Sequence, residues 1–137
     1  MTRNVIAVVV GMIAGMAANM AFVIMNKALY PMPQGVDSND KEGFAEYIGS
    51  LPVIALLIII VAHLSQAFVG GGVAARISAD RLMTVAMIVG ALSLVAGVVT
   101  MYMMPPVPSW MLIEMPLYLV AAWAAAKLEQ KRRSRTA

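Results

Sequence analysis

The chain has 137 residues, of which 61% are hydrophobic and 12% are charged, and its formal net charge is +3. Ordinary soluble domains carry roughly twice that charged fraction. The chain contains no cysteine, which excludes disulfides, thiol catalysis, thiolate metal sites and iron–sulfur clusters. The mean hydropathy of +0.83 indicates a membrane protein.

Four long apolar runs fill most of the chain, and each has about the 20 residues that an α-helix needs to cross a bilayer. They predict membrane spans at about 5–29, 51–75, 82–104 and 109–128. Little of the sequence remains outside them, so we predict a single membrane domain over residues 1–137.

Basic residues are distributed unevenly between the two sides of these spans. Lys27 and Lys41 fall on one side, and eight fall on the other: Arg3, Arg76, Arg81, Lys127, Lys131, Arg132, Arg133 and Arg135. The positive-inside rule therefore predicts that both termini are cytoplasmic and that the loop 30–50 is on the outer side. The basic tail 127–137 is expected to face anionic lipid, and it is too short and too poor in aromatic residues for nucleic acid.

The outer loop contains a further predicted helix. Pro31 and Pro33 end the first span, and the sequence 39–42 has the spacing of a capping box, an N-cap followed three residues later by Glu. Apolar residues then recur at helical spacing, which predicts a short amphipathic helix over 40–49.

The other two connections, 77–80 and 104–108, are short turns. Short turns join antiparallel neighbours. We therefore predict an all-α membrane protein: an antiparallel bundle of four transmembrane helices, with the amphipathic outer helix between the first and second spans.

Glu114 is one of two ionisable residues inside the apolar runs. A charge at the centre of a bilayer costs at least about 2.5–3.5 kcal/mol, so such a residue is paired, protonated or in contact with water. At 1.5 Å per helical residue, Glu114 is expected about one turn inside the outer interface, beside a kink at Pro116. It is either an ion or proton site, or a shallow carboxylate that reaches interfacial water or pairs with Lys27.

His63 is the other ionisable residue, and it is expected deeper than Glu114, near the middle of the second span. Gln66 follows at i+3 on the same helix face, and Asn19 lies near the middle of the first span. With Glu114 they form a candidate intramembrane polar site. The alternative for His63 is a neutral histidine hydrogen-bonded to a neighbouring helix, and the alternative for Asn19 is an interhelical hydrogen bond worth about 0.6–2 kcal/mol. One histidine and few carboxylates argue against a metal site.

Gly11 and Gly15 form a G-x-x-x-G pattern on the first span. Such a pattern allows two helices to approach closely. The partner helix is either another helix of the same bundle or the same helix of a second copy, and the pattern leaves both open.

Three segments carry a resemblance to a known family: the sequences YPMPQGVD at 30–37, HLSQAFVGG at 63–71 and EMPLY at 114–118. Together they resemble a family of small bacterial four-span membrane proteins with no known activity, over nearly the whole chain. The resemblance implies an inner-membrane location and lends no functional residues. Small multidrug transporters also have four short spans, but their essential glutamate lies in the first helix, where this chain has none.

Three functional hypotheses remain. The first is a non-enzymatic inner-membrane protein, a structural or accessory subunit without a cofactor that associates with lipid and with further copies or a larger membrane complex. The second is a small proton- or cation-coupled transporter or channel that uses Glu114, assisted by His63, Gln66 and Asn19. The third, a lipid-modifying enzyme, is the weakest, because two ionisable groups at different depths make a poor acid–base pair; no catalytic residue is predicted.

Overall fold

The computed structural model describes residues 2–36, 40–104 and 107–136, and these residues form helices without strands. The elements in chain order are α1 (Thr2–Leu29), α2 (Lys41–Ser50), α3 (Val53–Ile77), α4 (Leu82–Met103), the 3-10 helix η1 (Ser109–Ile113) and α5 (Glu114–Thr136). Four helical segments are long and apolar enough to cross a membrane: α1, α3, α4 and the continuous η1–α5 segment. The predicted all-α bundle is confirmed, and the chain is a multi-pass membrane protein.

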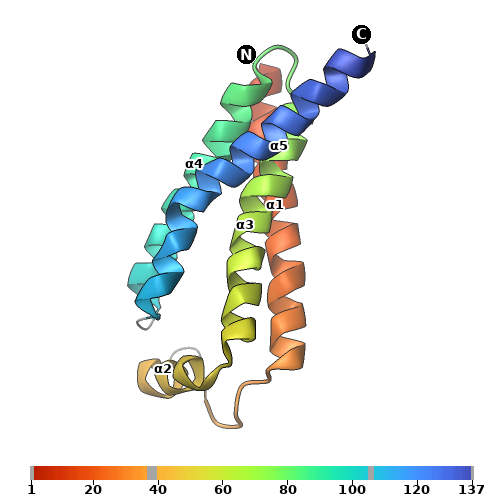
Figure 1. Ribbon diagram of the computed structural model, residues 1–137. Helices are drawn as coiled ribbons and strands as arrows, with labels where there is room; N and C mark the ends of the chain where they lie inside the picture. The colour runs from red at the N-terminus through yellow and green to blue at the C-terminus, as the bar shows by residue number, and fades with distance from the viewer. Residues whose placement is uncertain (1, 37–39, 105–106, 137) are drawn as a thin grey trace.

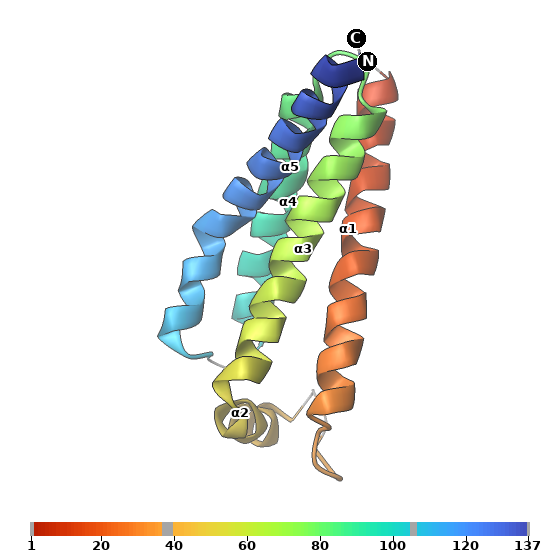
Figure 2. The same ribbon diagram turned by 45° about the vertical axis from the view of Figure 1, so that its right-hand side comes forward.

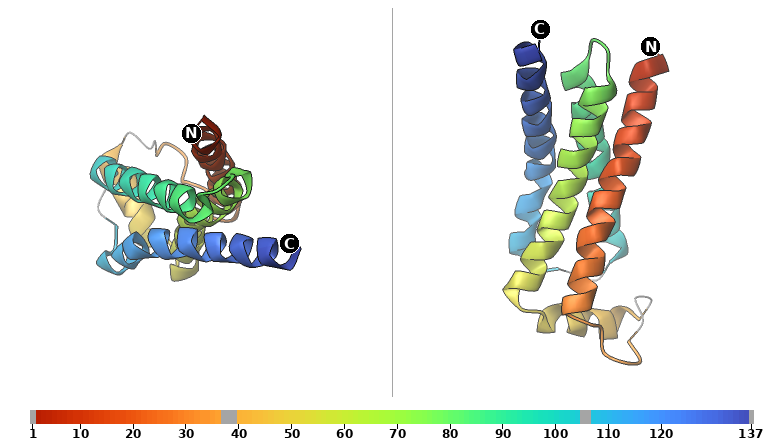
Figure 3. Two further views of the ribbon diagram at one scale, coloured as in Figure 1. Left: turned by 90° about the horizontal axis from the view of Figure 1, so that it is seen from above. Right: turned by 90° about the vertical axis from the view of Figure 1, so that its right-hand side faces the viewer.

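The four long helices run alongside one another, and both termini lie at one end of the bundle (Figure 1). The short helix α2 crosses the opposite end, as Figure 2 shows. We call these the termini end and the α2 end. Helix α3 contacts each of the other long helices, and α1 and α5 lie on either side of α3 and α4 (Figure 3). Side chains of α3 can therefore contact α1, α4 and α5.

Helix α2 is fixed at both its start and its middle. Asp40 is its N-cap and accepts a hydrogen bond from the Gly43 N–H at 3.2 Å. The predicted capping box starts at Asn39, which lies outside the described residues. The hydroxyl of Tyr47 donates to the Tyr30 carbonyl at 2.7 Å, and burial raises the pKa of Tyr47 above its ordinary value. The Tyr47–Tyr30 hydrogen bond ties α2 to the residue that follows α1.

The interior of the bundle differs between its two ends. Near the α2 end, large side chains of α3 and η1 pack together, with Leu56, Ile60 and Met111 buried. Near the termini end, the interior is built mainly from alanine, glycine and valine, as in the cluster of Ala75, Ala86 and Ala126. Small residues let helix backbones approach closely, which is the main source of packing energy in lipid.

Helix α1 is the most exposed span. Of its most apolar 18-residue stretch, only 11% of residues are buried, against 28–39% in the other three spans. Its buried residues form one narrow stripe: Ala7, Gly11, Gly15 and Asn26. The rest of α1 presents valine, isoleucine and methionine to its surroundings, which suits contact with lipid or with another membrane helix.

Candidate functional site: a buried histidine–glutamate pair

His63 on α3 and Glu114 on α5 are in direct contact. The Nδ1 atom of His63 lies 3.2 Å from Oε1 and 3.1 Å from Oε2 of Glu114. The Glu114 side chain is 8% exposed and that of His63 is 27% exposed. The pair has two states that differ only in which residue holds one proton: imidazolium with carboxylate, or imidazole with carboxylic acid. The net charge of the pair is zero in both states. The pair therefore satisfies the requirement that an intramembrane charge has a partner.

The expected difference in depth between these two residues is wrong. His63 lies ten residues after the start of α3, about 15 Å along the helix, and Glu114 reaches it. The end of α4 and the start of η1 lie nearer the termini end than the start of α3 does (Figure 1). Glu114 therefore lies deeper in the bundle than a count from its own turn predicts, and it pairs with His63 instead of Lys27.

The fourth span is not a single α-helix around Pro116, as the prediction of a kinked helix assumed. Residues Ser109–Ile113 form the 3-10 helix η1, and α5 begins at Glu114. Pro116 therefore stands in the first turn of α5, where a backbone N–H has no intrahelical acceptor and proline is tolerated. The carboxyl projects from the point where the 3-10 helix changes to an α-helix.

Tyr118 covers one side of the pair and was missed in the sequence. Its ring is stacked on that of His63, with centroids 6.4 Å apart and planes at 22°, and the residue is 2% exposed. A Cβ on Gly97 of α4 would lie 2.8 Å from the Tyr118 hydroxyl, so the glycine makes room for the phenol. The spacing Glu114–Tyr118 is i, i+4, which was the available signal.

Asn19 and Gln66 form a second polar pair. The Asn19 Nδ2 donates to Gln66 Oε1 at 2.7 Å and joins α1 to α3. Gln66 was expected to share a face with His63, but three positions leave two side chains about 60° apart on a helix. His63 contacts α5 and Gln66 contacts α1, so the four candidate residues form two separate pairs rather than one strip.

The G-x-x-x-G pattern is used inside the bundle, against α3. A Cβ on Gly11 would lie 2.6 Å from the Gly70 carbonyl oxygen, and one on Gly15 would collide with the Gln66 carbonyl. Of the two interpretations left open, packing within one chain is the one that the structure shows. This close approach is what allows Asn19 to reach Gln66.

Some buried polar atoms of the described residues have no hydrogen-bond partner: Asn19 Oδ1, Asn26 Oδ1 and Ser93 Oγ. Ser93 is 1% exposed, so its hydroxyl is an unpaired polar group inside α4. An unpaired hydroxyl of this kind costs about 1–3 kcal/mol. These atoms do not extend either polar pair into a continuous chain.

Two surface hollows, of about 440 and 270 Å³, lie toward the termini end and are lined by neither His63 nor Glu114. Among the described residues, no group of three or more His, Asp or Glu comes together as metal ligands. The His63–Glu114 pair is therefore a two-residue contact between helices.

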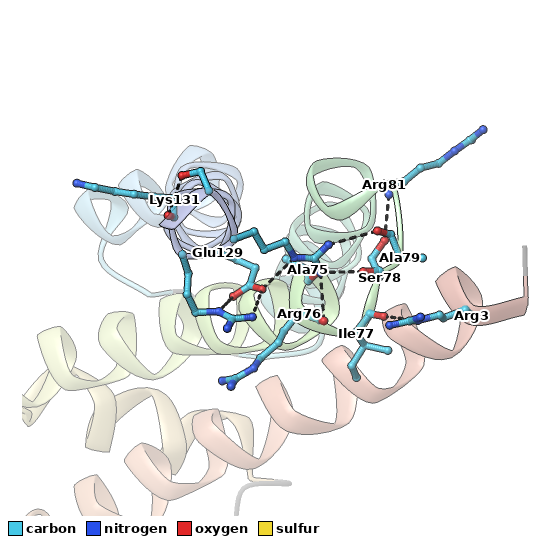
Figure 4. Close-up of polar contacts among 12 residues, drawn as sticks. Arg3, Ala75, Arg76, Ile77, Ser78, Ala79, Arg81, Glu129 and Lys131 are labelled. Carbon is cyan, nitrogen blue, oxygen red and sulfur yellow. Dashed lines mark hydrogen bonds and ion pairs between the residues drawn. The ribbon is translucent and has the colours of Figure 1, made fainter. Parts of the chain in front are cut away.

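Polar contacts at the termini end join the tail of α5 to the end of α3, where Figure 4 labels Ala75, Ser78 and Ala79, and Arg133 makes many of them. Its guanidinium donates to four backbone carbonyls where α3 ends, those of Ala75, Arg76, Ser78 and Ala79, at 2.8–3.3 Å. Glu129 accepts from both Arg132 at 2.7 Å and Arg133 at 3.1 Å. The basic tail, expected only as a lipid-facing anchor, thus also caps a neighbouring helix.

No protein-family model matches the chain, and comparisons with curated proteins and with solved structures found no match. The functional argument therefore rests on the membrane fold and on the contacts described above. The resemblance to small bacterial four-span proteins stays a prediction.

Proposed function

We propose that the protein is a non-enzymatic integral protein of the bacterial inner membrane that acts as a structural or accessory subunit. One observation carries this proposal: the four residues of the candidate polar site bond to one another in pairs across helix interfaces. His63–Glu114 joins α3 to α5, and Asn19–Gln66 joins α1 to α3. Side chains used in this way hold the bundle together and require no substrate pathway.

The proposed orientation places both termini in the cytoplasm, which follows from the eight basic residues on that side. The cysteine-free chain allows a direct test with a membrane-impermeant maleimide on intact spheroplasts. A cysteine at Gly49, on α2, should be labelled from outside, and one at Ser134 should be labelled only after lysis. The reverse pattern would refute this orientation.

The proposed structural role of the pair is tested by Glu114→Gln and His63→Ala. Breaking a buried pair by removing one partner destabilises a protein by about 3–5 kcal/mol, so both variants should unfold at lower denaturant. Proton flux into wild-type proteoliposomes under a pH gradient should equal that of empty liposomes. A wild-type flux above this background would contradict the proposal if Glu114→Gln abolished it without loss of folding.

Such a flux would support the second candidate function, a small proton-coupled transporter. One observation favours this alternative: two groups that exchange protons face each other within a membrane bundle at 3.1 Å. Chains of Asp, Glu and His are used as proton relays in membrane pumps and transporters. The flux measurement separates the two functions because the structural role predicts a stability change only.

The proposed association with further membrane helices is tested on α1, whose exposed face is the widest of the four spans. Single cysteines at Ile13 and Met20, both more than half exposed, should cross-link to a second copy or to another membrane protein in native membranes. Val95 on α4 provides an equally exposed control position. Only monomer at every position, with efficient labelling, would contradict the subunit role.

A further inference from the structure

A shallow groove of about 270 Å³ runs between α3 and α5 toward the termini end. Its walls are mostly apolar, from Phe68, Val69 and Val73 on α3 and from Leu128 on α5, and two charged residues, Arg76 and Glu129, line it as well. From Phe68 to Arg76 the groove follows about 12 Å of helix, which is most of the roughly 15 Å hydrocarbon depth of one leaflet.

Gly72 provides the floor of this groove. The three consecutive glycines of α3 face different surroundings: a Cβ on Gly70 would lie 2.7 Å from the Gly11 carbonyl oxygen, and one on Gly71 would lie 3.2 Å from Ala122 Cα. A Cβ on Gly72 would meet only Ala125 Cβ, at 3.7 Å. Helix packing requires small residues at 70 and 71, whereas at 72 the missing side chain leaves the groove open.

Positive charge lies where the groove reaches the termini end. Arg76 lines the groove there and is exposed. The Arg132 guanidinium is held on the neighbouring turn of α5 by two 2.7 Å bonds to Glu129. Arg76 and Arg81 point to opposite sides of the bundle in Figure 4. Arg132 and Arg133 both bond to the single carboxylate of Glu129. Together with Arg76, these three guanidinium groups outnumber that carboxylate, which leaves net positive charge at this end of the groove.

We propose that this groove binds an anionic phospholipid, with one acyl chain between α3 and α5 over Gly72 and the phosphate on Arg76. The apolar walls match the chain, and the excess positive charge matches the headgroup at the depth where headgroups begin. Basic pockets between transmembrane helices bind anionic headgroups by this combination. The inference is independent of the proposed subunit role.

The charge component is tested by titrating the detergent-solubilised full chain with phosphatidylglycerol and measuring the bound fraction by native mass spectrometry. Arg76→Gln should weaken binding about fivefold, since a basic residue near a membrane surface contributes about 1 kcal/mol. Arg81→Gln, which removes the same charge on the other side of the same end, should stay within about twofold. Equal losses in the two variants would overturn the site, because diffuse charge would then explain the binding.

The chain component is tested by Gly72→Leu, which fills the groove without changing charge. It should weaken phosphatidylglycerol binding about tenfold, the equivalent of a ~1.4 kcal/mol overpacking cost. Ala91→Leu, on an exposed face of α4, is the matched control and should bind as wild type. If Gly72→Leu does not fold, Val69→Trp fills the same groove. Unchanged binding in a folded groove-filling variant would overturn the proposal.

Two ligand controls separate a lipid from a free anion. Phosphatidylcholine with the same acyl chains should bind wild type more weakly and should not respond to Arg76→Gln, because its headgroup has no net charge. Inorganic phosphate at the lipid concentration should not displace phosphatidylglycerol. Displacement by phosphate would overturn the assignment to a lipid.

Discussion

The glycines at 70, 71 and 72 allow a sharp test of the helix packing, through the pair of variants Gly70→Ala and Gly72→Ala. A Cβ at 70 would lie 2.7 Å from the Gly11 carbonyl oxygen and 3.0 Å from Val89 Cγ1. A Cβ at 72 would make an ordinary contact of 3.7 Å with Ala125. Both changes are the same substitution in the same helix, so their intrinsic helix propensities cancel on comparison.

The difference between the two variants therefore measures the steric cost alone. A backbone oxygen of α1 cannot swing aside as a side chain does, so relief at position 70 requires α1 and α3 to move apart. Overpacking of this kind costs about 1–3 kcal/mol. Gly72→Ala should keep the gain in helix propensity, up to about 1 kcal/mol. Gly70→Ala should therefore be less stable than Gly72→Ala by about 1–3 kcal/mol.

The free energy of unfolding is measured by titrating micelle-solubilised protein with a denaturing detergent while following helical circular dichroism. Gly35→Ala provides a comparison in which the backbone conformation, and not helix packing, opposes the added side chain. The φ of Gly35 is 88°, which disfavours any side chain, and nothing lies within 4 Å of a Cβ added there. If Gly70→Ala were as stable as Gly72→Ala, the close α1–α3 approach described above would be refuted.

Three further predictions concern polar side chains and use the same unfolding measurement. Asn19→Ala should destabilise the bundle by about 0.6–2 kcal/mol, and a double-mutant cycle with Gln66→Ala should show coupling; strict additivity would contradict the Asn19–Gln66 bond. Ser93→Ala should be neutral or stabilising by up to about 1 kcal/mol, since its hydroxyl is buried without a partner; a clear loss of stability would reveal a bond that this geometry lacks. Arg133→Met should cost about 1.5–3 kcal/mol through the freed carbonyls of α3, whereas Arg135→Met should change stability by less than about 0.5 kcal/mol; similar effects would refute the capping role.

The four long apolar helices and their arrangement as a bundle were predictable because hydropathy reports directly on the lipid environment. Span length follows from bilayer thickness, and short turns enforce antiparallel neighbours. The outer helix was predictable for a similar reason, since an N-cap and an amphipathic period are local signals. Each of these features depends on residues that are close together in the chain.

The contacts of the site were not predictable, because they depend on how helices shift and rotate against one another. The depth of Glu114 below the outer interface was predicted by counting residues from the preceding turn at the α-helical rise of about 1.5 Å each. The 3-10 helix η1 instead rises about 2.0 Å per residue, which places Glu114 deeper. The start of η1 also lies nearer the termini end than the start of α3 does (Figure 1). In the sequence, nothing distinguishes Arg133 from the other cations of the basic tail. The rotation of α5 about its axis is what directs the Arg133 guanidinium at the end of α3.

The distribution of small and large residues indicates which part of the α3–α5 seam would have to open for a proton to reach Glu114 from water. Toward the termini end, Ala122 packs against both Gly71 and Gly90: a Cβ added at Gly71 would lie 3.4 Å from the Ala122 Cβ, and one added at Gly90 would lie 2.6 Å from it. Alanine has no side-chain torsion that could move it aside and both glycines present only backbone, so the seam cannot open at this contact unless the helices move apart. Toward the α2 end, the seam is closed by η1 and the flexible side chain of Met111, which is 4% exposed. Because 3-10 helices have poorer hydrogen-bond geometry than α-helices, opening would begin at η1, on the side that carries α2. A proton entering from there would find no continuing polar chain among the described residues beyond His63, and this favours a structural role over transport.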